Sequence, residues 1–208
     1  LEQAIGAKLL IERAMELDVA VTAADIDDEV KKVTEQVGGE ELREGMHVKV
    51  YVVDVKETEK GPRVLISRTH PGLVKRLFEM QVPEIFDGTV EIKAVSREAG
   101  SRTKMAVFAN DENVDAVGAC IGAKGARVAE IVEELGGEKI DLIEYHEDPE
   151  QFVAAALAPA SVISVTMTGE RACRVRVAPD QLSLAIGKEG QNAKLAAKLT
   201  GLKIDIKA

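Results

Sequence analysis

The sequence predicts an α/β (α+β) chain in which one domain, ordered helix-strand-strand-helix-helix-strand, occurs twice in tandem. Three observations support this fold class. An Ile-Gly-x-x-Gly motif stands at residues 121–125 and again at 186–190. Each copy is followed by an amphipathic helical pattern and a strand that contains Lys-Ile-Asp, and each is preceded by a helix and two strands. The different character of residues 1–70 predicts a separate N-terminal part.

The front of the chain is expected to form a helical hairpin with an acidic exterior. Apolar residues recur at steps of mostly three and four over residues 5–17 and again over 26–37, behind a threonine that resembles an N-cap. Residues 1–45 carry 5 Lys/Arg against 12 Asp/Glu. The acidic run at 25–29 is typical of a solvated helix face and not of a metal site.

A pair of strands is expected next. Residues 46–55 and 63–68 alternate apolar and polar side chains on either side of a turn at 57–62. Two strands with one apolar face are not a stable domain by themselves. We therefore expect residues 1–42 to pack on this hairpin.

The elements of the two repeats follow the same order. We expect helices at 72–80 and 149–157, strand pairs at 89–98 with 103–110 and at 161–168 with 172–178, and closing strands that contain Ile140 and Ile204. The expected domains are therefore residues 1–70, 71–147 and 148–208. Because only a few residues link the two repeats, we expect the repeats to pack together rather than tumble independently.

The glycine motifs indicate a loop that binds phosphates. A helix N-terminus has unpaired N–H groups and the positive end of the helix dipole, which attract phosphate oxygens. Glycine permits close approach and a positive φ angle. Lys124 in Gly-Ala-Lys-Gly and Lys188 in Gly-Lys-Glu-Gly add a cation to each loop. One such loop alone is more often a tight helix-helix connection, but two copies with the same surroundings favour binding of a sugar-phosphate backbone.

The charge balance requires any such binding to be local. The net charge is −9 at pH 7, which by itself argues against a nucleic-acid partner. Residues 147–208, however, carry 8 Lys/Arg against 7 Asp/Glu. Recognition of a polyanion must therefore depend on individual cations and backbone N–H groups.

Other chemistry is mostly excluded. No apolar run approaches the roughly 20 residues of a membrane span, and the charged first 20 residues do not form a secretory signal. Cys120 and Cys173 stand alone, which favours reduced, buried thiols in a cytoplasmic protein. His47, His70 and His146 lack ligand spacing, and neither glycine motif is a Walker loop. We therefore expect no catalytic residue, no metal site, no cofactor and no enzymatic activity.

The repeated plan resembles a KH module of the bacterial type, which uses a GXXG loop to clamp about four nucleotides of single-stranded RNA or DNA. Longer segments are more specific: SRTHPGLVKRLFEMQVPEIFDGTVEIKAVSREAGSRTKMAV, VGACIGAKGARVAEIVEELGGEKIDLIEY and QLSLAIGKEGQNAKLAAKLTGLKIDI. These segments strongly resemble the NusA family of bacterial transcription elongation, termination and antitermination factors. The resemblance runs from near Gly39 to the end, and residues 1–38 do not share the family's pattern.

The resemblance implies a function and partners. It implies a rigidly packed tandem pair of type II KH domains that binds one extended strand of nascent RNA. It also implies association with RNA polymerase and other elongation factors during pausing, termination and antitermination, in the cytoplasm and without a membrane. By the same resemblance, residues 46–68 correspond to the last two strands of an OB-type RNA-binding barrel.

The candidate RNA-binding residues lie in the two loops and beside them. They are Gly122, Ala123, Lys124, Gly125 and Arg127 in the first repeat, and Gly187, Lys188, Glu189, Gly190, Gln191, Asn192 and Lys194 in the second. Ile121, Ile186, Ile140 and Ile204 are expected to form an apolar floor under the bases. The alternative function is a protein-interaction scaffold, in which the repeats or the acidic hairpin bind protein and the loops are only structural.

Overall fold

The computed structural model describes residues 47–58 and 61–208. The predicted helical hairpin, and its packing on the strand pair, lie outside these residues. The strand pair itself is present: β1 (Tyr51–Thr58) and β2 (Gly61–Ser67) form a two-stranded antiparallel sheet. The assignment of these two strands to an OB-type barrel stays a prediction.

The predicted start of the first strand at residue 46 is wrong. The ladder pairs Tyr51 with Ser67, the last residue of β2, so the residues before Tyr51 have no strand partner. Side chains of other elements bind this segment instead. The carbonyl of Lys49 accepts a hydrogen bond from the Arg68 guanidinium at 2.6 Å, and its N–H donates to the Glu134 carboxylate at 3.2 Å.

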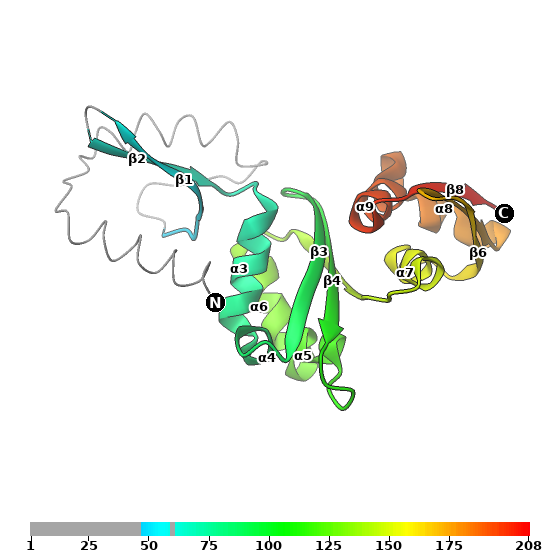
Figure 1. The fold of residues 1–208 in the computed structure, drawn as a ribbon, viewed down its shortest axis with the longest axis horizontal. Helices are drawn as coiled ribbons and strands as arrows, with labels where there is room; N and C mark the ends of the chain where they lie inside the picture. Colours follow the sequence, from blue (N-terminus) through cyan, green and yellow to red (C-terminus); the bar gives the residue numbers. More distant parts are fainter. Residues whose placement is uncertain (1–46, 59–60) are drawn as a thin grey trace. The chain divides into compact units, whose positions relative to one another are not determined.

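The first repeat is a three-stranded sheet with helices on one face (Figure 1). Its sheet order is β3-β4-β5, with β4 antiparallel to β3 and parallel to β5. The elements are α3 (Pro71–Gln81), α4 (Pro83–Phe86), β3 (Val90–Glu98), β4 (Arg102–Ala109), α5 (Ala116–Ile121), α6 (Ala126–Glu134) and β5 (Lys139–Glu144). A short 3-10 turn, η1 (Ala123–Gly125), lies between α5 and α6. The core between helices and sheet includes Phe78, Met105, Ile131 and Leu135.

The second repeat has the same order of elements. They are α7 (Pro149–Ala156), β6 (Val162–Gly169), β7 (Ala172–Val177), η2 (Pro179–Gln181), α8 (Leu182–Ile186), η3 (Lys188–Gly190), α9 (Gln191–Thr200) and β8 (Lys203–Lys207). Its sheet order, β6-β7-β8, again combines one antiparallel and one parallel pair. The predicted order helix-strand-strand-helix-helix-strand is therefore confirmed in both repeats, with shifts of one or two residues at the boundaries. The short helix α4 has no counterpart in the second repeat, and η2 has none in the first.

The two repeats share a hydrophobic core. The core of the second repeat, which includes Val153, Leu157 and Leu199, also contains Ala106 of β4 and Ile143 of β5. The sheet of the first repeat thus uses both of its faces, one for its own helices and one for the second repeat. The expectation of packed rather than independent repeats agrees with this arrangement.

A buried carboxylate and its arginine partner link the segment that enters the first repeat to the β3–β4 turn and the start of β5. Glu138, which is fully buried, accepts hydrogen bonds from the Arg97 guanidinium, the Thr103 hydroxyl at 2.6 Å and the Gly100 N–H at 2.9 Å. Arg97 also donates to the carbonyls of Arg68 and His70, at 2.7 and 2.9 Å. One ion pair therefore fixes the β3–β4 turn, the start of β5 and the chain segment that enters α3.

A buried lysine joins the repeats. The ammonium of Lys104 on β4 donates to the Asp141 carboxylate at 3.0 Å and to the carbonyl of Ala158, in the second repeat, at 2.7 Å. Burial lowers the pKa of Lys104 below its ordinary value of 10.5, although the nearby Asp141 carboxylate raises it. The lysine is therefore satisfied by a contact that exists only when the repeats are packed.

The two cysteines are free and buried, as predicted. Burial raises the pKa of the Cys120 thiol to about 12, and it also raises the pKa of Cys173. Within the described residues no group of three or more His, Cys, Asp or Glu could hold a metal ion. A search of the same residues finds no helix that is both long and apolar enough to cross a membrane.

Replacing Glu138 with alanine should strongly destabilise the protein. The variant leaves the buried Arg97 guanidinium without its carboxylate, and removal of one partner from a buried ion pair costs about 3–5 kcal/mol. Chemical denaturation of parent and variant measures the loss. Glu112→Ala, at an exposed glutamate between β4 and α5, is the control and should be close to neutral. Equal effects of the two substitutions would contradict the role assigned to Glu138.

The contribution of Lys104 to stability should rise with pH. Because its folded-state pKa is lowered, the unfolded chain holds the Lys104 proton more tightly than the folded chain. The free energy of unfolding of the parent, relative to Lys104→Met, should therefore increase as pH rises from the lowered pKa towards the ordinary value of 10.5. Denaturant titrations at several alkaline pH values check this trend, and a difference that does not change with pH would contradict it.

Candidate nucleic-acid interface

The two Gly-x-x-Gly loops have the same backbone conformation. Gly122 and Gly187 adopt φ/ψ of 73/176° and 76/169°, and Gly125 and Gly190 adopt positive φ of 80° and 76°. In the first loop Lys124 has φ 54°, and in the second Glu189 has the same value. The sequence repeat is therefore also a repeat of an unusual backbone path, which connects two helices at both places.

The first glycine of each loop is required by close packing inside the protein. A Cβ atom on Gly187 would lie 2.8 Å from the backbone nitrogen of Asn192, and one on Gly122 would lie 2.6 Å from the Arg127 side chain. The second glycine is different. A Cβ on Gly125 would meet nothing within 4 Å, and one on Gly190 would meet only the Lys194 side chain at 3.6 Å. At the second position glycine permits the positive φ angle, and the space outside the loop is open.

Arg127 and Asn192 occupy the same position of the repeat, and each donates to a carbonyl of the preceding helix. Arg127 donates from Nη1 to the carbonyl of Ala119 at 2.6 Å and to Glu84 at 3.0 Å. Asn192 is buried and donates from Nδ2 to the carbonyls of Leu157 and Ala185, at 3.0 and 3.1 Å. Both side chains thus bind the end of the preceding helix to the start of the next one.

Two further predicted site residues, Gln191 and Lys194, follow the second loop. Lys194 is exposed and its ammonium donates to the carbonyl of Glu189 at 2.9 Å, so it lies over the loop. Gln191 points away from the loop to the first repeat, where its amide donates to the Ser101 hydroxyl at 2.7 Å and to Glu98 at 3.2 Å. The exposed side chains of the loops themselves are Ala123, Lys124, Lys188 and Glu189.

The predicted apolar floor is partly exposed. Ile121 and Ile186, directly before the loops, each keep 38% of their surface accessible. Ile140 and Ile204, on β5 and β8, are half-buried and pack against the cores of their repeats. These four residues are therefore close to the surface in both repeats, although they also contribute to the fold.

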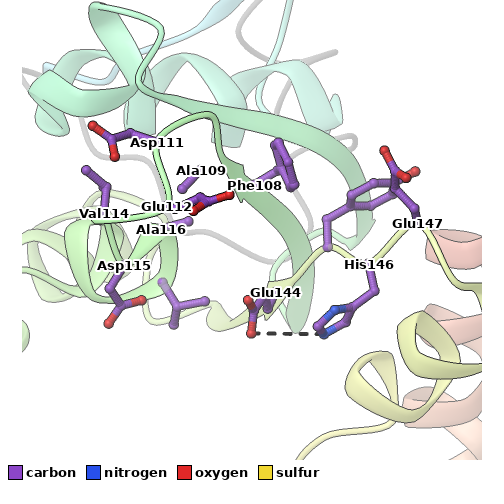
Figure 2. Close-up of a pocket in the computed structure, with 12 residues that line it drawn as sticks. Phe108, Ala109, Asp111, Glu112, Val114, Asp115, Ala116, Glu144, His146 and Glu147 are labelled. Atoms are coloured by element: carbon purple, nitrogen blue, oxygen red, sulfur yellow. Dashed lines mark ion pairs between the residues drawn. The ribbon is translucent and has the colours of Figure 1, made fainter.

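A hollow of about 310 Å³ lies where α5 begins and β5 ends (Figure 2). Phe108 and Tyr145 line it, together with five carboxylates from Asp111, Glu112, Asp115, Glu144 and Glu147. Asp115 is the N-cap of α5 and accepts from the Gly118 N–H at 2.9 Å. So many carboxylates repel phosphates. The acidic hollow therefore disfavours a polyanion at this end of β5, a feature that the sequence analysis did not identify.

Comparison with known proteins is consistent with this geometry. The description "NusA-like first KH domain" matches residues 68–145, and "NusA-like second KH domain" matches residues 149–208. The chain belongs to the NusA family. It carries the family's tandem KH region, so the predicted mixed α/β fold with two NusA-type KH domains is confirmed.

Relatives from several bacteria support the same assignment. Proteins named "Transcription termination/antitermination protein NusA" from Halalkalibacterium halodurans and Bacillus subtilis are each 56% identical over 177 residues. These matches cover 85% of this chain and 46% and 48% of the relatives. The protein of that name from Mycobacterium bovis is 53% identical over 188 residues, which is 89% of this chain and 54% of the relative. The chain thus spans about half the length of the curated relatives it matches.

Alanine at the first glycine of a loop should be more damaging than alanine at the second. Gly190→Ala places a side chain in the left-handed region, which costs about 1–2 kcal/mol. Gly187→Ala adds a contact with the Asn192 backbone to a φ/ψ combination that is nearly exclusive to glycine, so its loss of stability should be clearly larger. Thermal or chemical unfolding of the two variants provides the comparison. The reverse order would show that packing behind the loop is not what requires Gly187.

Proposed function

We propose that this chain is a non-enzymatic RNA-binding region of a transcription factor. It binds an extended single strand of nascent RNA through both GxxG loops, and so modulates pausing, termination and antitermination by bacterial RNA polymerase in the cytoplasm. The observation that carries the proposal is the pair of identical loop conformations with exposed lysines, in a chain of the NusA family. RNA polymerase and other elongation factors are the partners that this proposal includes.

The donors for phosphate are the central residues of each loop. The N–H groups of Gly122 and Gly125 donate to the carbonyls of Gly118 and Gly122, at 2.9 and 3.1 Å. In the second loop, the N–H of Gly187 donates to the carbonyl of Ser183, and the N–H of Gly190 donates to the carbonyl of Gly187. We therefore assign the phosphate contacts to the N–H groups of residues 123–124 and 188–189, rather than to those of the glycines.

The side chains divide into those that bind RNA and those that hold the loops. Lys124, Lys188 and Lys194 are exposed at the loops and supply positive charge near the phosphates. Ile121 and Ile186 offer exposed apolar surface for bases beside the loops. Arg127 and Asn192 are assigned to the helix junctions, since Arg127 Nη1 and Asn192 Nδ2 each donate to backbone carbonyls there.

The second loop is the less favourable of the two for a phosphate. The position with φ 54° holds a lysine in the first loop and Glu189 in the second. Glu189 adds a negative charge beside Lys188, and Lys194 partly offsets it from the next turn of helix. The proposal therefore assigns the larger electrostatic contribution to the first loop.

Aspartate at both central residues of a loop should weaken RNA binding and preserve the fold. The substitutions Ala123→Asp with Lys124→Asp, or Lys188→Asp with Glu189→Asp, put carboxylates where phosphates bind. A loss of roughly 1–3 kcal/mol per loop is expected. The fold should survive, because these residues are exposed and aspartate tolerates a positive φ better than most residues. Fluorescence anisotropy with single-stranded RNA measures the affinity, and circular dichroism checks the fold.

Glu189→Lys is the matched control for charge. It removes the carboxylate from the second loop and should increase affinity, with a steeper dependence on salt. If the folded double-loop aspartate variant binds RNA as tightly as the parent, the loops are not the site. The protein-interaction scaffold would then be the better description of the chain.

A further inference from the structure

We propose that Lys139, the first residue of β5, is a third contact for the RNA. The RNA meets this lysine between the first loop and the second. The inference rests on the proposed function. It adds a residue outside both glycine motifs and a direction for the RNA across the first KH domain. It depends on how the two domains are joined.

The second loop is attached to one turn of the first domain. Gln191 directly follows that loop, and its amide donates to the Ser101 hydroxyl at 2.7 Å and to Glu98 at 3.2 Å. Glu98 is the last residue of β3, and Ser101 lies in the turn between β3 and β4. An RNA strand that reaches the second loop from the first domain must therefore approach this turn.

Lys139 lies beside the same turn. Its backbone N–H donates to the carbonyl of Ser101 at 3.1 Å, and β5 pairs with β4 such that Lys139 is opposite Arg102. The buried Glu138, directly before it, accepts from the Gly100 N–H. Ser101 thus contacts Gln191 through its side chain and Lys139 through its backbone. The start of β5 and the second loop are held against one short segment.

The charge of Lys139 is uncompensated, unlike that of its neighbours. Arg102 and Lys104 both pair with Asp141, and Arg97 pairs with Glu138. Lys139 is exposed, and among the residues 47–58 and 61–208 it forms no ion pair. A lysine that has no ion-pair partner, next to cations that do, is available to bind a phosphate. Lys203 has the same place at the start of β8, with its N–H on the carbonyl of Arg171 at 2.9 Å.

The opposite end of β5 repels a polyanion. The acidic hollow lies there, with Glu144 at the end of the strand and Asp115 at the start of α5. Glu144 is five residues after Lys139 in β5, so roughly 17 Å separate this end from Lys139. The charge distribution along β5 therefore favours an RNA path past Lys139 and the β3–β4 turn over one past the acidic end of the strand.

The test compares RNAs of two lengths. One has about four nucleotides, the length that one KH module clamps, and the other has about twelve, long enough for both loops and the crossing. Lys139→Ala should weaken binding of the long RNA roughly three- to tenfold and reduce its salt slope by about one. Binding of the short RNA should not change. Lys75→Ala removes an exposed lysine from α3 and serves as the control, which should match the parent with both RNAs.

Each result has one meaning. A loss with the long RNA alone supports the proposal. An unchanged affinity for the long RNA, an equal loss with both RNAs, or an equal loss in Lys75→Ala would overturn it. If the aspartate loop variants lose binding and Lys139→Ala does not, the loops are the site and only this inference fails. If the parent binds neither RNA, the proposed function fails and this inference fails with it.

Discussion

The ion pair between Arg97 and Glu138 is the interaction on which the rest of the structure depends. Both side chains are almost completely removed from solvent, and the carboxylate is satisfied by a guanidinium, a hydroxyl and a backbone N–H. Such a pair is stable only when every partner is present, because an uncompensated buried charge is very unfavourable. The turn that it fixes carries the contact with Gln191 and the start of β5. A group that lies outside both loops therefore holds the turn through which the second loop contacts the first repeat.

The loops illustrate how one residue type can meet two different demands. Glycine at the first position allows the following helix to approach the preceding one, and glycine at the second position allows a positive φ in open space. Arg127 and Asn192 complete the first arrangement from the helix side. The rigid part of each loop thus faces the protein, and the exposed part faces solvent. A binding loop of this kind is held in shape before any ligand arrives.

The fold of the repeats could be predicted from the sequence because its signals are local and occur twice. Helical spacing, strand alternation and the glycine motifs located the main helices and strands of residues 71–208 to within a few residues, although not the short helix α4. The start of β1 could not be predicted, because the alternation continues to residue 46 and only the pairing register ends it at Tyr51. That register depends on the length of β2, which alternation alone does not define.

The candidate site was predicted less completely, for a physical reason. Arg127 and Asn192 differ in charge, and the sequence analysis placed both among the candidate RNA-binding residues without relating them to each other. What they share is a donor directed at a carbonyl, and that depends on the distance between two helices. Their equal distance from the glycine motifs was the signal that could have revealed this shared role. The interdomain contact of Gln191 left no such signal in the sequence.

The shared core has a consequence for the order of folding during synthesis. Ala106 and Ile143 belong to strands of the first KH domain, but their side chains complete the core of the second. The ribosome releases the first domain before the second, and domains generally fold as units in that order. The outer face of the first sheet is thus formed before its cover exists, and it then provides a template on which α7 and α9 can assemble. Until then the nascent chain carries an exposed apolar face.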